Sequence, residues 1–248
     1  MKKWIVLILL LFSVSVYAGN LIVGTGGMGT SGGGAAYCSG GELFCEDFEG
    51  EDVAWDADPD TEDCDGYDTD GDFCDDDTTN YKNGSEGCGL RGTTTYYFQE
   101  ALSSASDEFY IEFWVKFSDV TTVNSVNIRS ADYATKVVKL YLDSESNLVV
   151  YVNNDAVTYD GSYTFIADTW THVGVYYKEE PGINDGIVRA WIDTDGVFVA
   201  GDLDINETAV DTGSTDGAGL RIYGSSIAGI AVYDDLKVVD GEPSWPTS

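Results

Sequence analysis

Apolar and polar side chains alternate along residues 109–117. All five odd positions are apolar, and the even positions hold Tyr110, Glu112, Trp114 and Lys116. Successive side chains of a β-strand point to opposite faces, so a period of two predicts a half-buried strand whose odd face points to the core.

Similar short runs follow at intervals along the rest of the chain. They occupy residues 137–142, 148–152, 171–177, 187–192 and 230–239. Turn-forming residues separate them, as in Asn153-Asn154-Asp155, and no stretch of twelve residues carries a helical period. Short strands joined by such turns predict an all-β, antiparallel sandwich.

The first 18 residues have the three-part pattern of a secretory signal peptide. Lys2 and Lys3 precede an apolar run at 4–12, and Val16-Tyr17-Ala18 is typical of a cleavage site. The run is too short to span a bilayer, so we expect no membrane insertion after cleavage. The protein is predicted to be secreted, to the periplasm or the extracellular space.

Composition then divides the remaining chain. A glycine-rich stretch at 19–37 predicts a flexible leader. We expect one globular domain at 38–242 that contains an acidic, cysteine-bearing insertion at 51–87, and a short tail at 243–248.

The charge is strongly negative, with 44 acidic against 12 basic residues and a formal net charge of −32. This balance argues against nucleic acid and anionic membranes, which are polyanions. A hydrophobic content of 43% argues against disorder of the bulk of the chain. Residues 46–77 hold seventeen acidic side chains and no Lys or Arg, so the charge is concentrated near the start of the domain.

All five cysteines precede the strand-rich part of the chain: Cys38, Cys45, Cys64, Cys74 and Cys88. In an oxidising compartment they predict two disulfides and one remaining thiol, in a pairing that the sequence does not determine. Zinc is the alternative, but no C-x-x-C pair or partnering His lies nearby.

Residues 63–72 carry carboxylates at every second or third position, including Asp65, Asp68, Asp70 and Asp72. Oxygen ligands at this spacing, with glycines for tight turns, suit calcium. The run resembles one calcium-binding repeat of thrombospondin type 3 and lacks the Gly and Glu positions of an EF-hand loop. The alternative is a solvated acidic loop.

Several segments in a shared order resemble the concanavalin A-like jelly-roll superfamily, close to laminin-G-like and MAM domains. Residues 109–116 are similar to an early core strand of laminin-G-like domains, and 169–175 with 188–193 are similar to their "W-x-H-V" strand and its partner. Residues 44–49 and 230–236 resemble the first and last strands of a MAM domain. The resemblance covers 42–239 and implies a two-sheet antiparallel jelly-roll sandwich.

In domains of this kind the first and last strands lie side by side and their carboxylates hold a cation. The resemblance therefore implies calcium ligands at Asp47, Glu49 and Asp235, with Asp234 a further candidate. Crowded carboxylates repel one another unless a cation or water screens them, which agrees with this assignment. The alternative is that these carboxylates face water at the edge of the sheet.

No catalytic residue is predicted, and the sequence favours binding over catalysis. The E-x-D-x-x-E strand of related glycosidases and the Gln-x-His pair of related lyases are missing from the sequence. His172 is the only histidine and sits in the "W-x-H-V" motif, which implies a scaffold role.

The outward sides of three predicted strands supply candidate ligand contacts. These residues are aromatic or charged: Tyr110, Glu112, Trp114, Lys139, Tyr141, Arg189 and Trp191. Flat aromatic rings with charged neighbours suit a hydroxylated ligand, whereas the alternative places Trp114 and Trp191 in the core. We therefore expect a secreted, calcium-associated module that binds carbohydrate or a cell-surface ligand. A carbohydrate-active enzyme of the same fold and a structural or interaction protein are the alternatives.

Overall fold

The alternating segment at 109–117 forms strand β5 (Glu108–Phe117) in the computed structural model. The structure describes residues 41–46, 74–76, 81–83, 88–90, 96–120, 125–152, 156–179, 185–224 and 231–243. Of residues 74–76, 88–90, 96–98 and 224 it describes the backbone alone. All of these residues belong to one compact unit that spans 31–248.

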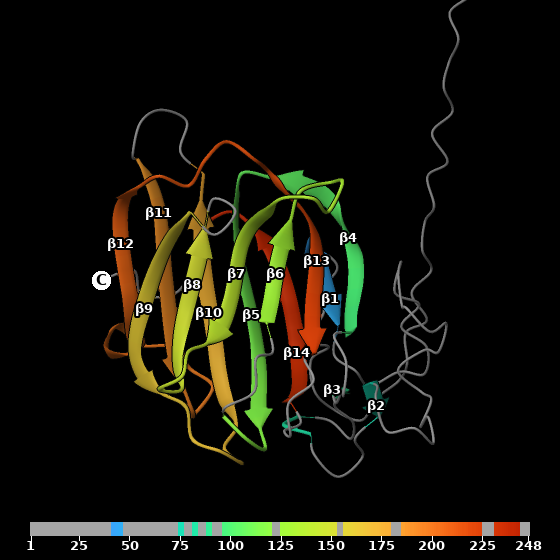
Figure 1. Ribbon diagram of the computed structural model, residues 1–248, viewed down its shortest axis with the longest axis vertical. Coiled ribbons are helices and arrows are strands. Elements are labelled where there is room, and N and C mark those ends of the chain that lie inside the picture. The colour runs from blue at the N-terminus through green and yellow to red at the C-terminus, as the bar shows by residue number, and fades with distance from the viewer. Residues whose placement is uncertain are drawn as a thin grey trace, which may run out of the picture. The chain divides into compact units, whose positions relative to one another are not determined.

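Two antiparallel sheets form the fold (Figure 1). The eight-stranded sheet has the order β12 (Leu203–Val210), β11 (Gly186–Asp193), β10 (Thr171–Lys178), β5, β14 (Ala231–Asp240), β3 (Cys88–Leu90) and β2 (Cys74–Asp76), and β1 (Phe44–Glu46) also pairs with β14. The six-stranded sheet has the order β4 (Tyr96–Ser106), β13 (Gly217–Gly224), β6 (Ser125–Arg129), β7 (Lys136–Leu142), β8 (Asn147–Val152) and β9 (Val157–Thr164).

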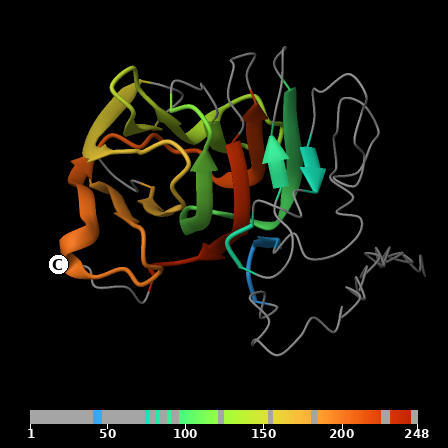
Figure 2. The same cartoon turned by 90° about the horizontal axis from the view of Figure 1, so that it is seen from below.

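This arrangement confirms the predicted two-sheet antiparallel jelly-roll sandwich. Each of the six strands predicted from alternation is present within one residue of its expected ends. Strands β1 and β14 come from opposite ends of the domain and pair with each other (Figure 2). The one helical element in the described ranges is a short 3₁₀ turn, Ala200–Asp202, so no helix there is long and apolar enough to cross a membrane.

The core lies between the sheets, because the inward side chains of both sheets are apolar. Ile111 and Val175 from the eight-stranded sheet belong to the same buried cluster as Val126 and Leu140 from the six-stranded sheet. The gap that remains is an apolar cavity of about 20 Å³ beside Phe113 and Leu140. It has room for about one water molecule, and its lining is mostly apolar.

A β-bulge interrupts β14 next to β5. Between the pairs Asp234↔Trp114 and Lys237↔Glu112, two residues of β14 oppose one residue of β5. The extra residue is Asp235, whose φ of 49° lies in the left-handed region that Asp tolerates. The bulge directs both Asp234 and Lys237 to the outer face while Leu236 stays in the core.

Candidate ligand-binding site

The seven predicted ligand contacts fall on two different outer faces of the sandwich. Five of them lie on the eight-stranded sheet: Tyr110, Glu112, Trp114, Arg189 and Trp191. Lys139 and Tyr141 lie on β7 of the six-stranded sheet. The structure therefore does not bring all seven together, and each face has to be considered by itself.

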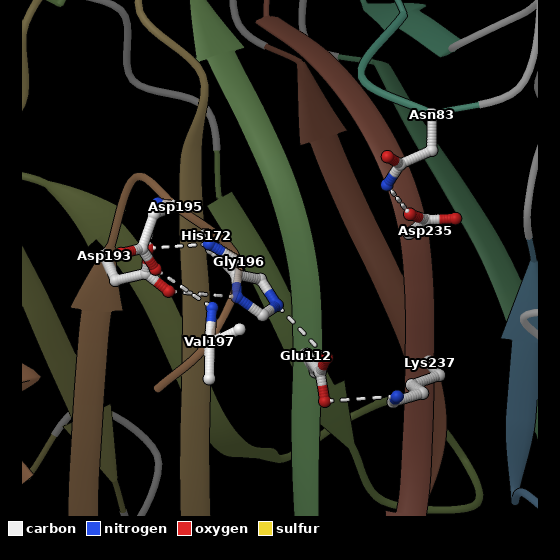
Figure 3. A network of polar contacts seen from close by, with 9 residues as sticks. All are labelled: Asn83, Glu112, His172, Asp193, Asp195, Gly196, Val197, Asp235 and Lys237. Carbon is white, nitrogen blue, oxygen red and sulfur yellow. Dashed lines mark hydrogen bonds and ion pairs between the residues drawn. The ribbon is translucent and has the colours of Figure 1, made fainter. Parts of the chain in front are cut away.

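On the eight-stranded sheet, strand register builds a polar network around the single histidine (Figure 3). His172 Nε2 lies 3.1 Å from Glu112 Oε1, and Lys237 Nζ lies 3.2 Å from Glu112 Oε2. On its other side, His172 Nδ1 lies 3.5 Å from Asp193 Oδ2. The other oxygen of Asp193 accepts a hydrogen bond of 2.9 Å from the amide of Gly196. The network thus joins four strands to the loop that follows β11.

That loop covers the network with an aromatic stack. The imidazole of His172 lies between the rings of Trp114 and Phe198, with centroid distances of 4.6 Å and 4.1 Å. Lys82 Nζ covers the Trp114 ring at 4.1 Å from its centroid. Carboxylates on both sides of an imidazole are suited to acid–base chemistry. Here, however, both faces of the ring are covered, so a substrate does not reach it in this conformation.

A second apolar cluster adjoins the network on the same face. Tyr176, Trp191 and Phe198 form its buried part, and Tyr110 packs against it. Trp191 is 0% exposed and Trp114 is 5% exposed. They are packed under the loop after β11 rather than between the two sheets. In this conformation neither offers an open aromatic surface, so their role as ligand contacts stays a prediction.

The outer face of the six-stranded sheet has a different character, because its aromatic rings are only half-buried. Tyr141 and Tyr151 stack with ring centroids 5.1 Å apart, and their hydroxyl oxygens are 2.9 Å apart in a hydrogen bond. Lys139 Nζ lies 4.9 Å from the centroid of Tyr141 and 5.2 Å from that of Tyr151. Burial, followed by the hydrogen bond to Tyr151, raises the pKa of Tyr141, so its hydroxyl stays protonated at neutral pH.

Polar side chains continue this face across the neighbouring strands. Lys139 pairs with Asn127, and Asn127 pairs with Arg221. Asn127 is 1% exposed, and its Nδ2 donates to Ser125 Oγ at 3.0 Å. Its Oδ1 has no hydrogen-bond partner among the described residues. A buried amide oxygen without a partner is costly, but Asn127 is buried too deeply for a ligand to reach it in this conformation.

Arg221 lies on β13 and continues the row toward the edge strand β4, which carries Gln99. Its Nε donates to Gln99 Oε1 at 2.8 Å, and its Nη1 donates to the Tyr223 hydroxyl at 2.9 Å. We call the row and its stacked pair the tyrosine–lysine face, made up of Gln99, Arg221, Asn127, Lys139, Tyr141 and Tyr151.

Sequence reasoning missed four members of this face: Gln99, Asn127, Tyr151 and Arg221. The signal was present for two of them. Asn127 lies between apolar Val126 and Ile128, and Arg221 lies between Leu220 and Ile222. This is the alternation that identified β5, over runs too short to stand out.

Most of the predicted calcium ligands lie outside the described residues: Asp47, Glu49, Asp65, Asp68, Asp70 and Asp72. Asp235 is described, and its carboxylate accepts a hydrogen bond from the Asn83 side chain (Figure 3). The neighbouring Asp234 accepts hydrogen bonds from the amides of Lys82 and Asn83 at 2.7 Å and 2.9 Å. Burial raises the pKa of Asp234 to about 7.

The calcium assignment is not decided by the described part of the chain. Within it, no three His, Cys, Asp or Glu residues group in a way that could hold a metal ion. Asp234 Oδ1 has no hydrogen-bond partner there, so one carboxylate oxygen remains available at the bulge. Cys45 of β1 is disulfide-bonded, and the pairing of the five cysteines stays a prediction.

No family model and no curated protein matches the chain. Among solved structures, a sialidase matches with a TM-score of 0.48 and 8% identity over 64% of this chain, which spans 16% of the sialidase. The binding domain of botulinum neurotoxin DC in complex with SialylT matches with a TM-score of 0.48 and 13% identity, over 70% of this chain and 43% of that one. The carbohydrate-binding module CBM66 from Bacillus subtilis matches with a TM-score of 0.44 and 12% identity, over 71% of this chain and 100% of the module. Such distant likeness assigns neither ligand nor activity.

Proposed function

We propose that this protein is a secreted carbohydrate-binding module and that its ligand surface is the tyrosine–lysine face. The observation that carries the proposal is the half-exposed stack of Tyr141 and Tyr151 with the Lys139 ammonium group over both rings. Tyrosine rings offer apolar area to the C–H face of a sugar, and their hydroxyls and neighbouring amides bond its hydroxyl groups.

Burial favours this face over the eight-stranded sheet. A sugar ring that stacks on Trp114 has to displace Lys82 and the segment around Gly196, both of which lie against the indole. A ligand on the tyrosine–lysine face needs only rotamer changes of long side chains such as Lys139. The smaller rearrangement leaves more of the interaction free energy for binding.

Calcium and secretion complete the proposal, and both rest on the sequence. The N-terminal signal pattern supports export. Asp235 and the available oxygen of Asp234 support a cation between the first and last strands, with Asp47 and Glu49 as its further ligands. A second cation would occupy the acidic run at 63–72. In such a module calcium would act on stability and loop order rather than on chemistry.

A glycan array with the full mature protein tests the proposal, run with calcium and with chelator. We expect binding that Tyr141→Ala weakens by about tenfold, since loss of a stacking aromatic costs about 1–2 kcal/mol. Tyr81→Ala is the matched control, because Tyr81 is 41% exposed and its neighbour Lys82 packs on the other sheet. Absence of glycan binding in both conditions would exclude the carbohydrate-binding function. An equal loss of glycan affinity in Tyr141→Ala and Tyr81→Ala would exclude the tyrosine–lysine face as the ligand surface.

A further inference from the structure

Arg221 lies over two tyrosine rings, as Lys139 does. Its Cζ is 5.2 Å from the ring centroid of Tyr133 and 5.7 Å from that of Tyr223. Tyr133 belongs to the turn between β6 and β7, and it reaches β13 because a glycine there leaves room for its ring. A Cβ at Gly219 would overlap the Tyr133 ring. We call Arg221, Tyr133 and Tyr223 the arginine unit.

The outer face of the six-stranded sheet therefore carries one arrangement twice. The lysine unit is made up of Lys139, Tyr141 and Tyr151, and its ammonium nitrogen lies 4.9 Å and 5.2 Å from the two ring centroids. In both units a long cationic side chain lies over two half-buried tyrosines. Flat aromatic area with a polar tip suits a sugar ring, so each unit offers a place for one sugar.

Strand register fixes the distance between the two units. Tyr223 pairs with Ser125, and Ser125 pairs with Tyr141. One strand, β6, separates the two tyrosines, so their backbones lie about 10 Å apart. Arg221 and Lys139 have the same relation in the neighbouring row. This separation matches the length of two sugars in a fully extended chain with equatorial linkages.

The side chains between the units are buried. Ser125 is 6% exposed and Asn127 is 1% exposed, so neither contributes to the surface that a ligand meets. Successive sugars of an extended, equatorially linked chain are turned over relative to one another, and every second sugar presents the same face. A chain of this kind can therefore stack one sugar on each unit, with one sugar between them.

We infer that the ligand is a linear glycan of extended, equatorially linked sugars, and that it crosses the strands with one sugar on the arginine unit and the next but one on the lysine unit. The inference rests on the proposed carbohydrate-binding function. A helical chain with axial linkages does not keep this repeat, so it engages one unit. A single terminal sugar likewise occupies one unit.

Titrations of the full mature protein with matched oligosaccharides test this inference. The probes are the disaccharide, trisaccharide and tetrasaccharide of the cellulose, chitin and mannan series, with maltose and maltotriose as axially linked isomers. In at least one of the three series we expect the trisaccharide to bind about tenfold more tightly than the disaccharide, because only the trisaccharide reaches both units and gains a second stacking contact. The tetrasaccharide should add little, and maltotriose should bind no more tightly than maltose.

Substitutions at Tyr223 locate the second contact. Tyr223→Ala should lower the affinity for the trisaccharide about tenfold, to that for the disaccharide, and should hardly change the latter. Tyr223→Phe keeps the ring and should keep the gain, so it separates stacking from the hydrogen bond to Arg221. Tyr81→Ala is the control, because Tyr81 is 41% exposed and its neighbour Lys82 packs on the other sheet. The comparison of chain lengths on the unsubstituted protein does not depend on these variants.

The outcomes separate this inference from the proposed function. Equal affinities for disaccharide and trisaccharide in all three series, or a gain in the maltose series as large, overturn the two-unit inference and leave glycan binding intact. Binding of an array glycan but of none of these probes does the same. Binding of no probe and no array glycan overturns both. A gain that Tyr223→Ala and Tyr81→Ala reduce equally overturns the arginine unit as the second contact.

Discussion

The indole of Trp114 and the imidazole of His172 stack at a centroid distance of 4.6 Å and an interplanar angle of 14°. The two residues face each other directly on neighbouring strands β5 and β10. The loop after β11 seals this stack, since Phe198 lies on the other face of the imidazole and Gly196 lies against the indole. Around Trp114 and His172 the outer face of the eight-stranded sheet is thereby a second packed layer rather than an open surface.

Gly196 is expected to be essential for packing the loop after β11 against the Trp114–His172 stack. Its φ of 93° is unfavourable for any residue with a Cβ, and a Cβ there would lie 3.1 Å from the Trp114 ring. Gly196→Ala should lower the free energy of unfolding by about 1–2 kcal/mol in urea denaturation. Gly201→Ala in the same loop is the control, because a Cβ there meets nothing within 4 Å. Similar losses of unfolding free energy for Gly196→Ala and Gly201→Ala would contradict a specific role of Gly196 in packing this loop on Trp114.

Glu112 is expected to stabilise the fold through its buried contacts with His172 and Lys237. Glu112→Gln should cost about 3–5 kcal/mol of unfolding free energy, because it removes one charge from a buried ion pair. Glu108→Gln is a matched control, since Glu108 pairs with Lys178 near the surface, where such pairs contribute at most about 1 kcal/mol. If the surface variant loses as much stability as the buried one, the network is not the stabilising element.

Stability is expected to depend on pH through Glu179. Burial, and after it the nearby carboxylate of Asp216, raises the pKa of Glu179 from 4.5 to about 7. A raised carboxyl pKa means that folding favours the protonated form. This contribution is fully present below pH 4.5 and is lost as the pH rises through about 7.

Glu179→Gln, which stays neutral, should therefore gain on the order of 1–2 kcal/mol relative to the unsubstituted protein when the pH is raised from 4.5 to 8. Unfolding free energies at both pH values measure this gain. Glu145→Gln, at the exposed turn after β7, should leave the pH dependence unchanged. The same pH dependence with and without the Glu179 side chain would exclude it as the source.

Calcium is expected to raise the melting temperature if it binds between the first and last strands. Asp47→Ala should lower the melting temperature by several degrees in calcium and hardly at all in chelator, because a bound ligand stabilises only the folded state. Asp143→Ala is the control, because this carboxylate accepts hydrogen bonds in the turn after β7, away from the first and last strands, so its loss of stability should be the same in both buffers. An Asp47→Ala loss that is independent of calcium rules this site out.

The sequence predicted strands well where a long alternating run has one buried face, and it missed strands with short runs, such as β6, and strands in which neither face is buried. β5 and β10 alternate strongly because their odd positions enter the core. β9 was not predicted, since its side chains alternate only between half-buried and exposed positions and carry little hydrophobic contrast. β12 was missed for the same reason, with its central residues exposed.

The candidate site was predictable only in part. Lys139 and Tyr141 were identified from the outward side of β7, as was Trp114 from that of β5. Their different exposure depends on residues far away in the sequence. Phe198 and Gly196 fold over the Trp114 stack, whereas the described segments place no comparable loop over Tyr141 and Tyr151.

By itself, the sequence determined the all-β class, the inward face of each alternating strand and the strongly negative charge, because these follow from side-chain period and composition. Only the tertiary structure decided that Arg221, Asn127 and Lys139 form one row, since β13, β6 and β7 are neighbours in a sheet order that the chain order does not dictate. Strand pairing brings together Asn127 and Arg221, which are 94 positions apart, and local patterns carry no information about contacts at that separation.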